Sequence, residues 1–174
     1  LDADDIKVPG TQFEPICCSV FIVDQKQIAT ERWNFYTKYS ESFFSTPIHS
    51  QHAAFDISSV SDKATLIATY YRMFQVDNGD VCNTYYKKPT DSQLAKCKQS
   101  IASSLNRLQD VWTPFAFSTV RLKSLIRAGD AAIQFPAANI ADKPLTGDYI
   151  AEHLEKPKKL QSVAISLKLK SHIQ

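Results

Sequence analysis

A pair of β-rich runs separated by four polar residues narrows the possible folds of this chain more than any other segment. The first run, Ile16–Val23, is apolar on both faces, which predicts a central strand of a sheet. Asp24–Gln27 interrupts it, and the second run, Ile28–Lys38, alternates in polarity. Its two faces carry different side chains: Trp33 and Phe35 on one, Arg32 and Asn34 on the other. Two such runs around a short polar segment predict a β-hairpin.

A period of two also marks the C-terminal segment, Leu160–Ile173. One face is apolar and the other mostly polar: Val163, Ile165, Leu167 and Leu169 against Ala164, Ser166, Lys168 and Lys170. This alternation predicts a half-exposed strand. Lysines on the solvent face are typical of an edge strand that is protected from aggregation. We therefore expect an available sheet edge in this segment.

Two segments carry apolar residues at spacings of three and four, which predicts helices. Thr90–Asp110 begins with a capping box in which Thr90 is the cap and Gln93 reaches back. Its apolar stripe runs through Leu94, Cys97, Ile101, Leu105 and Leu108. This long helix is expected to pack across the sheet. Ser61–Val76 predicts a second, shorter helix.

The remaining elements are short. Phe117–Arg127 alternates loosely and predicts a strand, with a short helix as the alternative. Ala131–Phe135 predicts another strand, and Asp148–Glu155 predicts one or two helical turns. Ser40–Ser59 shows no clear period, so we expect a long loop. Leu1–Glu14 contains Pro9-Gly10 and predicts an N-terminal arm.

Together these elements predict an α+β fold: a mostly antiparallel sheet with one long helix packed across it and a second shorter helix. The chain has 174 residues, of which 44% are hydrophobic and 22% charged, as in an ordinary globular domain. We expect a single domain at 15–174 after an arm at 1–14. Because the sequence starts at Leu1, either a segment was removed or the chain is part of a longer protein; no signal peptide is visible.

Charge and hydropathy bear on the kind of partner. The net charge is only +2 and the basic residues are scattered, which disfavours nucleic acid. No apolar run approaches the roughly 18 residues that cross a bilayer, so no membrane is expected. Neighbouring Cys17 and Cys18 cannot easily bridge each other, whereas Cys82 and Cys97 could. Apolar surroundings favour reduced thiols and a cytoplasmic or nuclear setting, with an extracellular or virion setting as the alternative.

The sequence offers no constellation for catalysis. His49 and His52 could meet one metal ion at helical spacing, but no Cys, Asp or Glu cluster lies close by in sequence. The apolar strand around Cys17 and Cys18 should raise a thiol pKa, which opposes a nucleophilic role. Four glycines are few for phosphate-binding loops. We therefore expect no catalytic residue, no metal and no cofactor, and a chain that is not an enzyme.

The hairpin and the long helix together resemble the middle of the HORMA domain family. Phe21–Asp24 matches an apolar strand that ends in an acidic turn, and Thr30–Phe35 matches the E-R-W-x-F strand that follows it. Gln93–Val111 would be the helix across the sheet, and Ser118–Arg127 the strand after it. The similarity covers roughly 15–135. The family has helices before the first of these strands, where this chain has only Leu1–Glu14.

The resemblance implies a non-enzymatic adaptor whose C-terminal segment can rearrange to enclose a partner peptide. Its mechanism would be strand addition at a sheet edge. Arg32 and Trp33 are residue types that dominate binding hot spots. The expected partner-binding residues are therefore Arg32, Trp33, Val163, Ile165, Leu167 and Leu169. The alternative is a self-assembling structural protein, such as a viral coat or a secreted module, so the partner is another protein or another copy of this chain.

Overall fold

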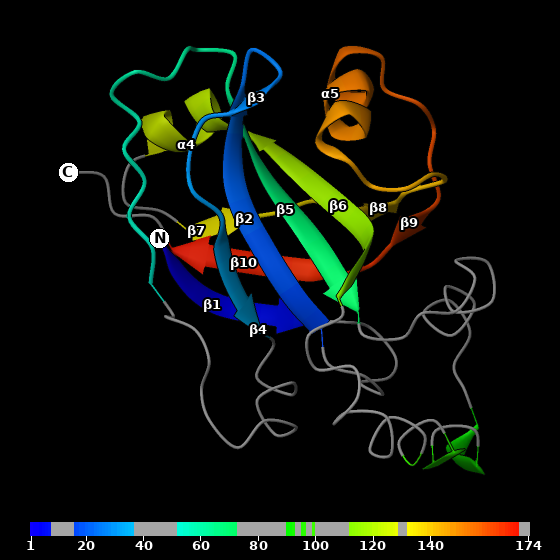
Figure 1. Ribbon diagram of the computed structural model, residues 1–174. Helices are drawn as coiled ribbons and strands as arrows, with labels where there is room; N and C mark the ends of the chain where they lie inside the picture. The colour runs from blue at the N-terminus through cyan, green and yellow to red at the C-terminus, as the bar shows by residue number, and fades with distance from the viewer. Residues whose placement is uncertain are drawn as a thin grey trace.

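The computed structural model describes residues 1–7, 16–36, 52–72, 90–92, 112–128 and 132–170, with 95, 96 and 99. They include two sheets and the helices α4 (Leu122–Ala128) and α5 (Gly147–Glu155) (Figure 1). Every strand pairing among them is antiparallel. The expected α+β class with a mostly antiparallel sheet is therefore confirmed.

The larger sheet has seven strands in the order β3-β2-β5-β6-β8-β9, with β4 also paired to β2. Their bounds are β2 (Ile16–Asp24), β3 (Gln27–Ile28), β4 (Trp33–Tyr36), β5 (Thr65–Arg72), β6 (Thr113–Arg121), β8 (Ala138–Ile140) and β9 (Ser162–Val163). The pairing of β5 with β6 shifts register at Tyr70/Tyr71. β2 and β5 lie inside this sheet, as expected for β2 from its apolar run.

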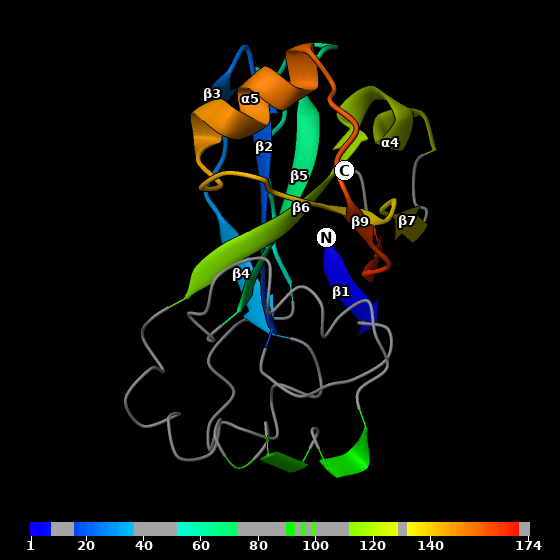
Figure 2. The same ribbon diagram turned by 90° about the vertical axis from the view of Figure 1, so that its right-hand side faces the viewer.

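The smaller sheet has the order β1-β10-β7, formed by β1 (Asp2–Lys7), β10 (Ser166–Lys170) and β7 (Ala132–Gln134). The chain passes from β9 to β10 through a tight bend in which the Ile165 N–H donates to the Val163 carbonyl at 2.8 Å. The smaller sheet crosses behind the larger one in Figure 1 and lies beside it in Figure 2, so the two form layers.

The β2–β3 connection is a tight hairpin turn. Its two central residues, Gln25 and Lys26, have φ of 48° and 70°. Positive φ at both central residues is the mark of the turn whose twist matches paired strands. The Ala29 N–H then donates to the Ile22 carbonyl at 2.8 Å, and the Ile22 N–H donates to Thr30 Oγ1 at 3.0 Å. The predicted hairpin is therefore confirmed.

The main core lies between the two sheets. Alternate residues of β2 point into it, and residues of the smaller sheet meet them: Ile16, Cys18, Val20 and Ile22 with Ile133, Leu167 and Leu169. The other face of β2, which we call the outer face of the larger sheet, carries Phe21. Phe21 and Ile67 of β5 pack there against Ile150 of α5 (Gly147–Glu155). β2 is buried on both sides because each face has its own cover.

The helix predicted at Ser61–Val76 is wrong, because Thr65–Arg72 is the strand β5. A strand buried on both faces has apolar residues at nearly every position, so spacings of three and four arise without a helix. Threonine and tyrosine in this segment favour a strand, through their fit to a pleated surface. The last part of the predicted helix, 73–76, lies outside the described residues.

Three shorter predictions agree with the structure in whole or in part. The strand expected at Phe117–Arg127 and its helical alternative each hold for part of the segment, since β6 ends at Arg121 and α4 (Leu122–Ala128) follows. The predictions at Ala131–Phe135 and Asp148–Glu155 are confirmed as β7 and α5. Thr146 caps α5, because its Oγ1 accepts from the Tyr149 N–H at 3.2 Å.

Two further predictions concern the N-terminal arm and the long helix. The segment predicted to be an arm contains β1, which pairs with β10, so that prediction is wrong for Asp2–Lys7. The Leu1 amino group also donates to the Ala53 carbonyl at 2.6 Å. Within Thr90–Asp110, the residues described as helical are Asp91, Ser92, Ala95, Lys96 and Gln99. Most of that segment lies outside the described residues, so the long helix stays a prediction.

Candidate functional site

Arg32 and Trp33 point to opposite faces of the larger sheet. Trp33 is only 7% exposed and belongs to the main core, where its ring lies 4.4 Å from that of Phe35. Arg32 is exposed on the outer face. The predicted alternation along this strand is thus confirmed, and of these two predicted partner-binding residues only Arg32 presents its side chain to solvent.

The four predicted residues of the C-terminal strand are buried. Val163, Ile165, Leu167 and Leu169 are each 1% exposed or less, while Lys168 and Lys170 are exposed. The period of two is therefore confirmed, but the predicted edge is wrong for β10, because β10 lies between β1 and β7. Ser162–Val163 forms β9, which ends the larger sheet among the residues described. A central strand with one face in solvent has the same alternation as an edge strand. The pattern alone could not distinguish them.

Arg32 stands at the centre of a group of side chains on the outer face. Its Cζ atom lies 4.2 Å from the centroid of the Phe21 ring, a cation–π contact. Its Nη1 donates to the Tyr71 hydroxyl at 3.4 Å. Burial raises the pKa of Tyr71, and the charge of Arg32 opposes that rise. Arg32 is thus exposed yet positioned by two aromatic side chains.

Two hydroxyl groups lie on the same face beside this contact. Ser19 and Thr69 face each other across β2 and β5, and they are 1% and 2% exposed. Within the described part of the chain, neither side-chain oxygen has a hydrogen-bond partner. The nearby Ser19 hydroxyl lowers the pKa of Tyr71, although its oxygen makes no hydrogen bond of good geometry. We call Ser19, Phe21, Arg32, Thr69 and Tyr71 the Arg32 cluster.

The β3 end of the larger sheet presents backbone groups as well as side chains. The hydrogen bond between Ala29 and Ile22 makes their pair a bonded one, and bonded and non-bonded pairs alternate in antiparallel strands. The Val23–Ile28 pair is therefore non-bonded, so the N–H and C=O of Ile28 point away from β2. Ile28 is also 45% exposed. We call Gln27–Arg32 the β3 edge.

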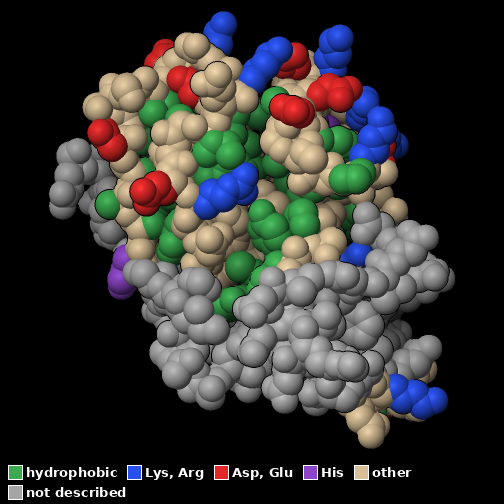
Figure 3. Space-filling model, in the orientation of Figure 1, with side chains coloured by type: hydrophobic (Ala, Val, Ile, Leu, Met, Phe, Trp, Pro, Cys, Tyr) green, Lys and Arg blue, Asp and Glu red, His purple; other side chains and the backbone are tan. Residues whose placement is uncertain are grey.

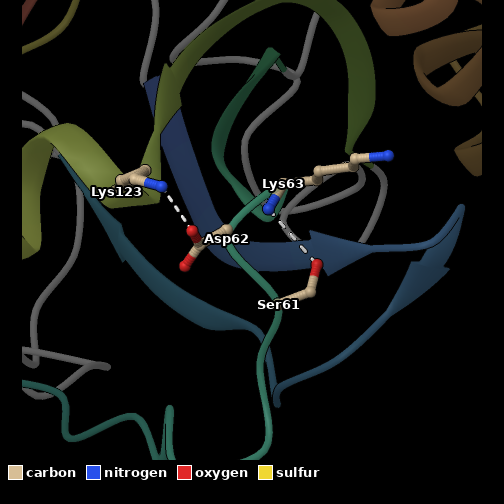
Figure 4. Close-up of polar contacts among 4 residues, drawn as sticks. All are labelled: Ser61, Asp62, Lys63 and Lys123. Carbon is tan, nitrogen blue, oxygen red and sulfur yellow. Dashed lines mark hydrogen bonds and ion pairs between the residues drawn. The ribbon is translucent and has the colours of Figure 1, made fainter.

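Ion pairs and hydrogen bonds fix the hairpin relative to its neighbours. Lys26 pairs with Glu155 of α5 at 2.7 Å. Asp24 accepts from the Ser61 N–H at 2.8 Å and from its hydroxyl, which lowers the Asp24 pKa. Next to Ser61, Asp62 pairs with Lys123 of α4 (Figure 4). The β3 edge therefore follows a turn that is held on two sides.

The thiols of Cys17 and Cys18 are unsuited to catalysis. Both are free and buried. Burial raises the pKa of Cys17 to about 12, and burial with the neighbouring thiol raises that of Cys18 well above its ordinary value. Both thiols stay protonated at neutral pH and are poor nucleophiles. The expected rise in thiol pKa is thus confirmed, while Cys82 and Cys97 lie outside the described residues.

Histidines and acidic residues show no shared site. In the described ranges no group of three or more His, Cys, Asp or Glu side chains could hold a metal ion. His52 is exposed, and His49 lies outside those ranges. His153 of α5 packs edge-on against Phe117 at 5.1 Å, and burial lowers its pKa. None of the helices described is long and apolar enough to cross a membrane.

The outer face of the larger sheet is partly apolar where it meets solvent. Figure 3 looks onto this face, where hydrophobic side chains are visible between charged ones. Sequence reasoning identified Arg32 but not its neighbours. Thr69 and Tyr71 were not identified because their segment was predicted as a helix. Ser19 and Phe21 fall at alternate positions of β2, a signal that was present in the sequence.

Comparison with protein-family models, with curated proteins and with solved structures gives no significant match. The HORMA resemblance therefore stays an expectation based on the residues of the hairpin and the segments after it.

Proposed function

We propose that this chain is a non-enzymatic protein-binding adaptor that captures a partner segment by strand addition at the β3 edge. The observation that carries the proposal is Ile28, whose backbone N–H and C=O point out of the sheet while its apolar side chain is 45% exposed. An outward row of backbone groups is a template for another strand. Backbone hydrogen bonds would supply affinity, and exposed side chains would supply specificity.

The position of Arg32 supports the same site. It ends the β3 edge, so a strand paired with Ile28 would pass beside the exposed guanidinium. Arginine is enriched among the residues that dominate binding energy. The Phe21 ring at 4.2 Å and the Tyr71 hydroxyl at 3.4 Å restrict the side chain before binding. Such preorganisation reduces the entropy lost on association.

Strand addition is also the mode of binding that the HORMA resemblance implies. The proposed edge is at β3, near the N-terminal end of the chain, instead of at the C-terminal strand. β10 cannot offer an edge while β1 and β7 are paired to it. Its apolar residues face the core between the sheets. The proposed binding surface therefore contains Arg32 and Ile28 rather than the C-terminal positions.

Peptides selected from a random library against the full chain provide a test. Ile28→Pro removes the outward N–H, and proline is tolerated at an edge position whose N–H faces solvent. It should weaken peptide binding by at least about tenfold, as measured by fluorescence anisotropy with labelled peptide. If Ile28→Pro binds every selected peptide with unchanged affinity, strand addition at this edge is excluded.

Gly147→Pro is a matched control for the introduced proline. Gly147 is the first residue of α5, where the N–H has no partner within the helix and proline is favoured. A Cβ atom there would meet nothing within 4 Å. Thr146 before it has φ −100° and ψ 166°, the extended conformation that precedes proline. This variant should bind peptide like the unmodified chain.

Self-association through the same edge would support the alternative, a self-assembling protein. Sedimentation over a range of concentrations measures it directly. Assembly that Ile28→Pro abolishes would identify the partner strand as a second copy of the chain. Assembly that persists in Ile28→Pro would place the self-contact elsewhere and leave the edge for a different protein.

A further inference from the structure

The Arg32 cluster brings one guanidinium and three hydroxyl groups to one face of the larger sheet. Ser19 and Phe21 are two residues apart on β2, and Thr69 and Tyr71 are two residues apart on β5. Residues two apart share a face of a strand. Because Ser19 pairs directly with Thr69, all four side chains lie on the outer face, where Arg32 extends over Phe21.

The two buried hydroxyls suggest that this group of residues has a ligand. A buried polar group without a hydrogen bond destabilises a fold, and most such groups in native proteins have a partner. Ser19 and Thr69 have none within the residues described, although they are 1% and 2% exposed. Each hydroxyl can donate one hydrogen bond. A ligand with several acceptor oxygens would satisfy both.

Arg32 has donors to spare for the same ligand. A guanidinium carries five N–H donors, and the contacts of Arg32 in the described chain are the Tyr71 hydroxyl and the Phe21 ring. No carboxylate of the described residues forms an ion pair with it. Guanidinium groups bind carboxylates and phosphates through two parallel hydrogen bonds. The positive charge and the hydroxyl donors therefore select an anion with several oxygens.

We propose that the Arg32 cluster binds an oxyanion, the carboxylate or phosphate group of a side chain on the captured partner segment. This inference rests on the proposed strand addition, because Arg32 ends the β3 edge and a segment paired with Ile28 passes beside it. Arg32 provides charge and two parallel donors. Tyr71, Ser19 and Thr69 provide further donors on the same face.

The test uses the isotope-labelled full chain and two simple anions, inorganic phosphate and acetate, titrated at constant ionic strength against sodium chloride. Saturable NMR shifts are expected at the Arg32 Nε–H and at the amides of Ser19 and Thr69. Arg32→Gln should weaken anion binding by about tenfold or more, since it removes the charge-assisted hydrogen bonds. Arg127→Gln removes an equal charge from the exposed end of α4 and should leave the affinity unchanged.

Two outcomes support the proposal and distinguish the source of the anion. Tighter binding of phosphate indicates a phosphorylated partner side chain, and tighter binding of acetate indicates an acidic one. The double variant Ser19→Ala with Thr69→Val, checked for folding by its NMR spectrum, should weaken either anion several-fold. Shifts that do not saturate, or an affinity that Arg32→Gln or the double variant leaves unchanged, would overturn the proposal.

Ile28→Pro separates this inference from the proposed function. It should lose the selected peptides and still bind phosphate or acetate, because the Arg32 cluster is not altered. If Ile28→Pro keeps its peptides while Arg32→Gln loses the anion, strand addition is wrong and the anion site stands. If the peptides are lost and no anion binds to the unmodified chain, strand addition stands and the anion site is wrong.

Discussion

Leu167 lies at the centre of the smaller sheet, and shortening it measures whether β10 is a core strand or a binding edge. The side chain is fully buried at 0% exposure and belongs to the main core. Its strand is paired with β1 on one side and β7 on the other. Leu167→Ala removes three carbon atoms from this environment without changing any charge.

The expected loss of stability is large. Transfer of the removed atoms accounts for about 2.4 kcal/mol at about 0.8 kcal/mol per carbon. The cavity left behind adds to this, and fully buried leucines shortened to alanine lose about 3–5 kcal/mol. We expect about 3–4 kcal/mol here. With a urea slope of about 2 kcal/mol per M, the unfolding midpoint should fall by about 1.5–2 M.

Urea unfolding followed by tryptophan fluorescence and circular dichroism provides the assay. Lys168→Ala is the matched control, because the next residue of the same strand is exposed and should change stability by no more than about 0.5 kcal/mol. If Leu167→Ala unfolds at the same urea concentration as the unmodified chain, the two-layer core is refuted. An edge residue reserved for a partner would give that result.

Three smaller predictions follow from the same structure. Cys17 and Cys18 should resist disulfide reagents in the folded chain at about pH 8 and react after unfolding, because burial raises both thiol pKa values. Mass spectrometry of the peptide that contains both cysteines locates the label. Rapid labelling of the native protein would contradict their burial. Gln25→Asn with Lys26→Gly should stabilise the chain by about 1 kcal/mol in urea unfolding, since both positions have positive φ. The Lys26 ion pair that is lost is exposed, so its removal costs little stability. An unchanged or lower unfolding midpoint would count against the turn geometry. The pKa of His153 lies below its ordinary 6.5 in the folded state, so the unfolded chain binds more protons between the two values. The contribution of neutral His153 to the free energy of unfolding should be complete above pH 6.5 and lost as the pH falls through the folded pKa. A His153→Gln variant whose stability depends on pH in the same way would disprove this prediction.

Patterns within one short segment predicted several elements well. The hairpin, β7, α5 and the alternation along β10 each follow from spacing within one short segment. A period of two and a turn between apolar runs are visible within one continuous segment, so no knowledge of distant residues was needed. β5 failed because burial on both faces removes the alternation that distinguishes a strand from a helix.

Pairing between distant segments could not be predicted in the same way. β1 and β10 lie at opposite ends of the chain, and only the pairing of β10 with both β1 and β7 shows that β10 is central. The Arg32 cluster has the same origin, because Tyr71 joins Arg32 only after β5 is aligned with β2. Sequence reasoning identified one exposed residue of that cluster by its type. The three hydroxyl groups of the cluster could be identified only from the register between β2 and β5.

The most direct test of the proposed binding site is hydrogen exchange at the Ile28 amide with and without a selected peptide. This N–H points away from β2, so in the free chain it should exchange faster than the Ala29 amide, which donates to Ile22. Bound peptide should slow the exchange of Ile28 by at least about tenfold, because the N–H becomes part of a strand pairing. Unchanged exchange at Ile28 with saturating peptide would contradict strand addition at the β3 edge.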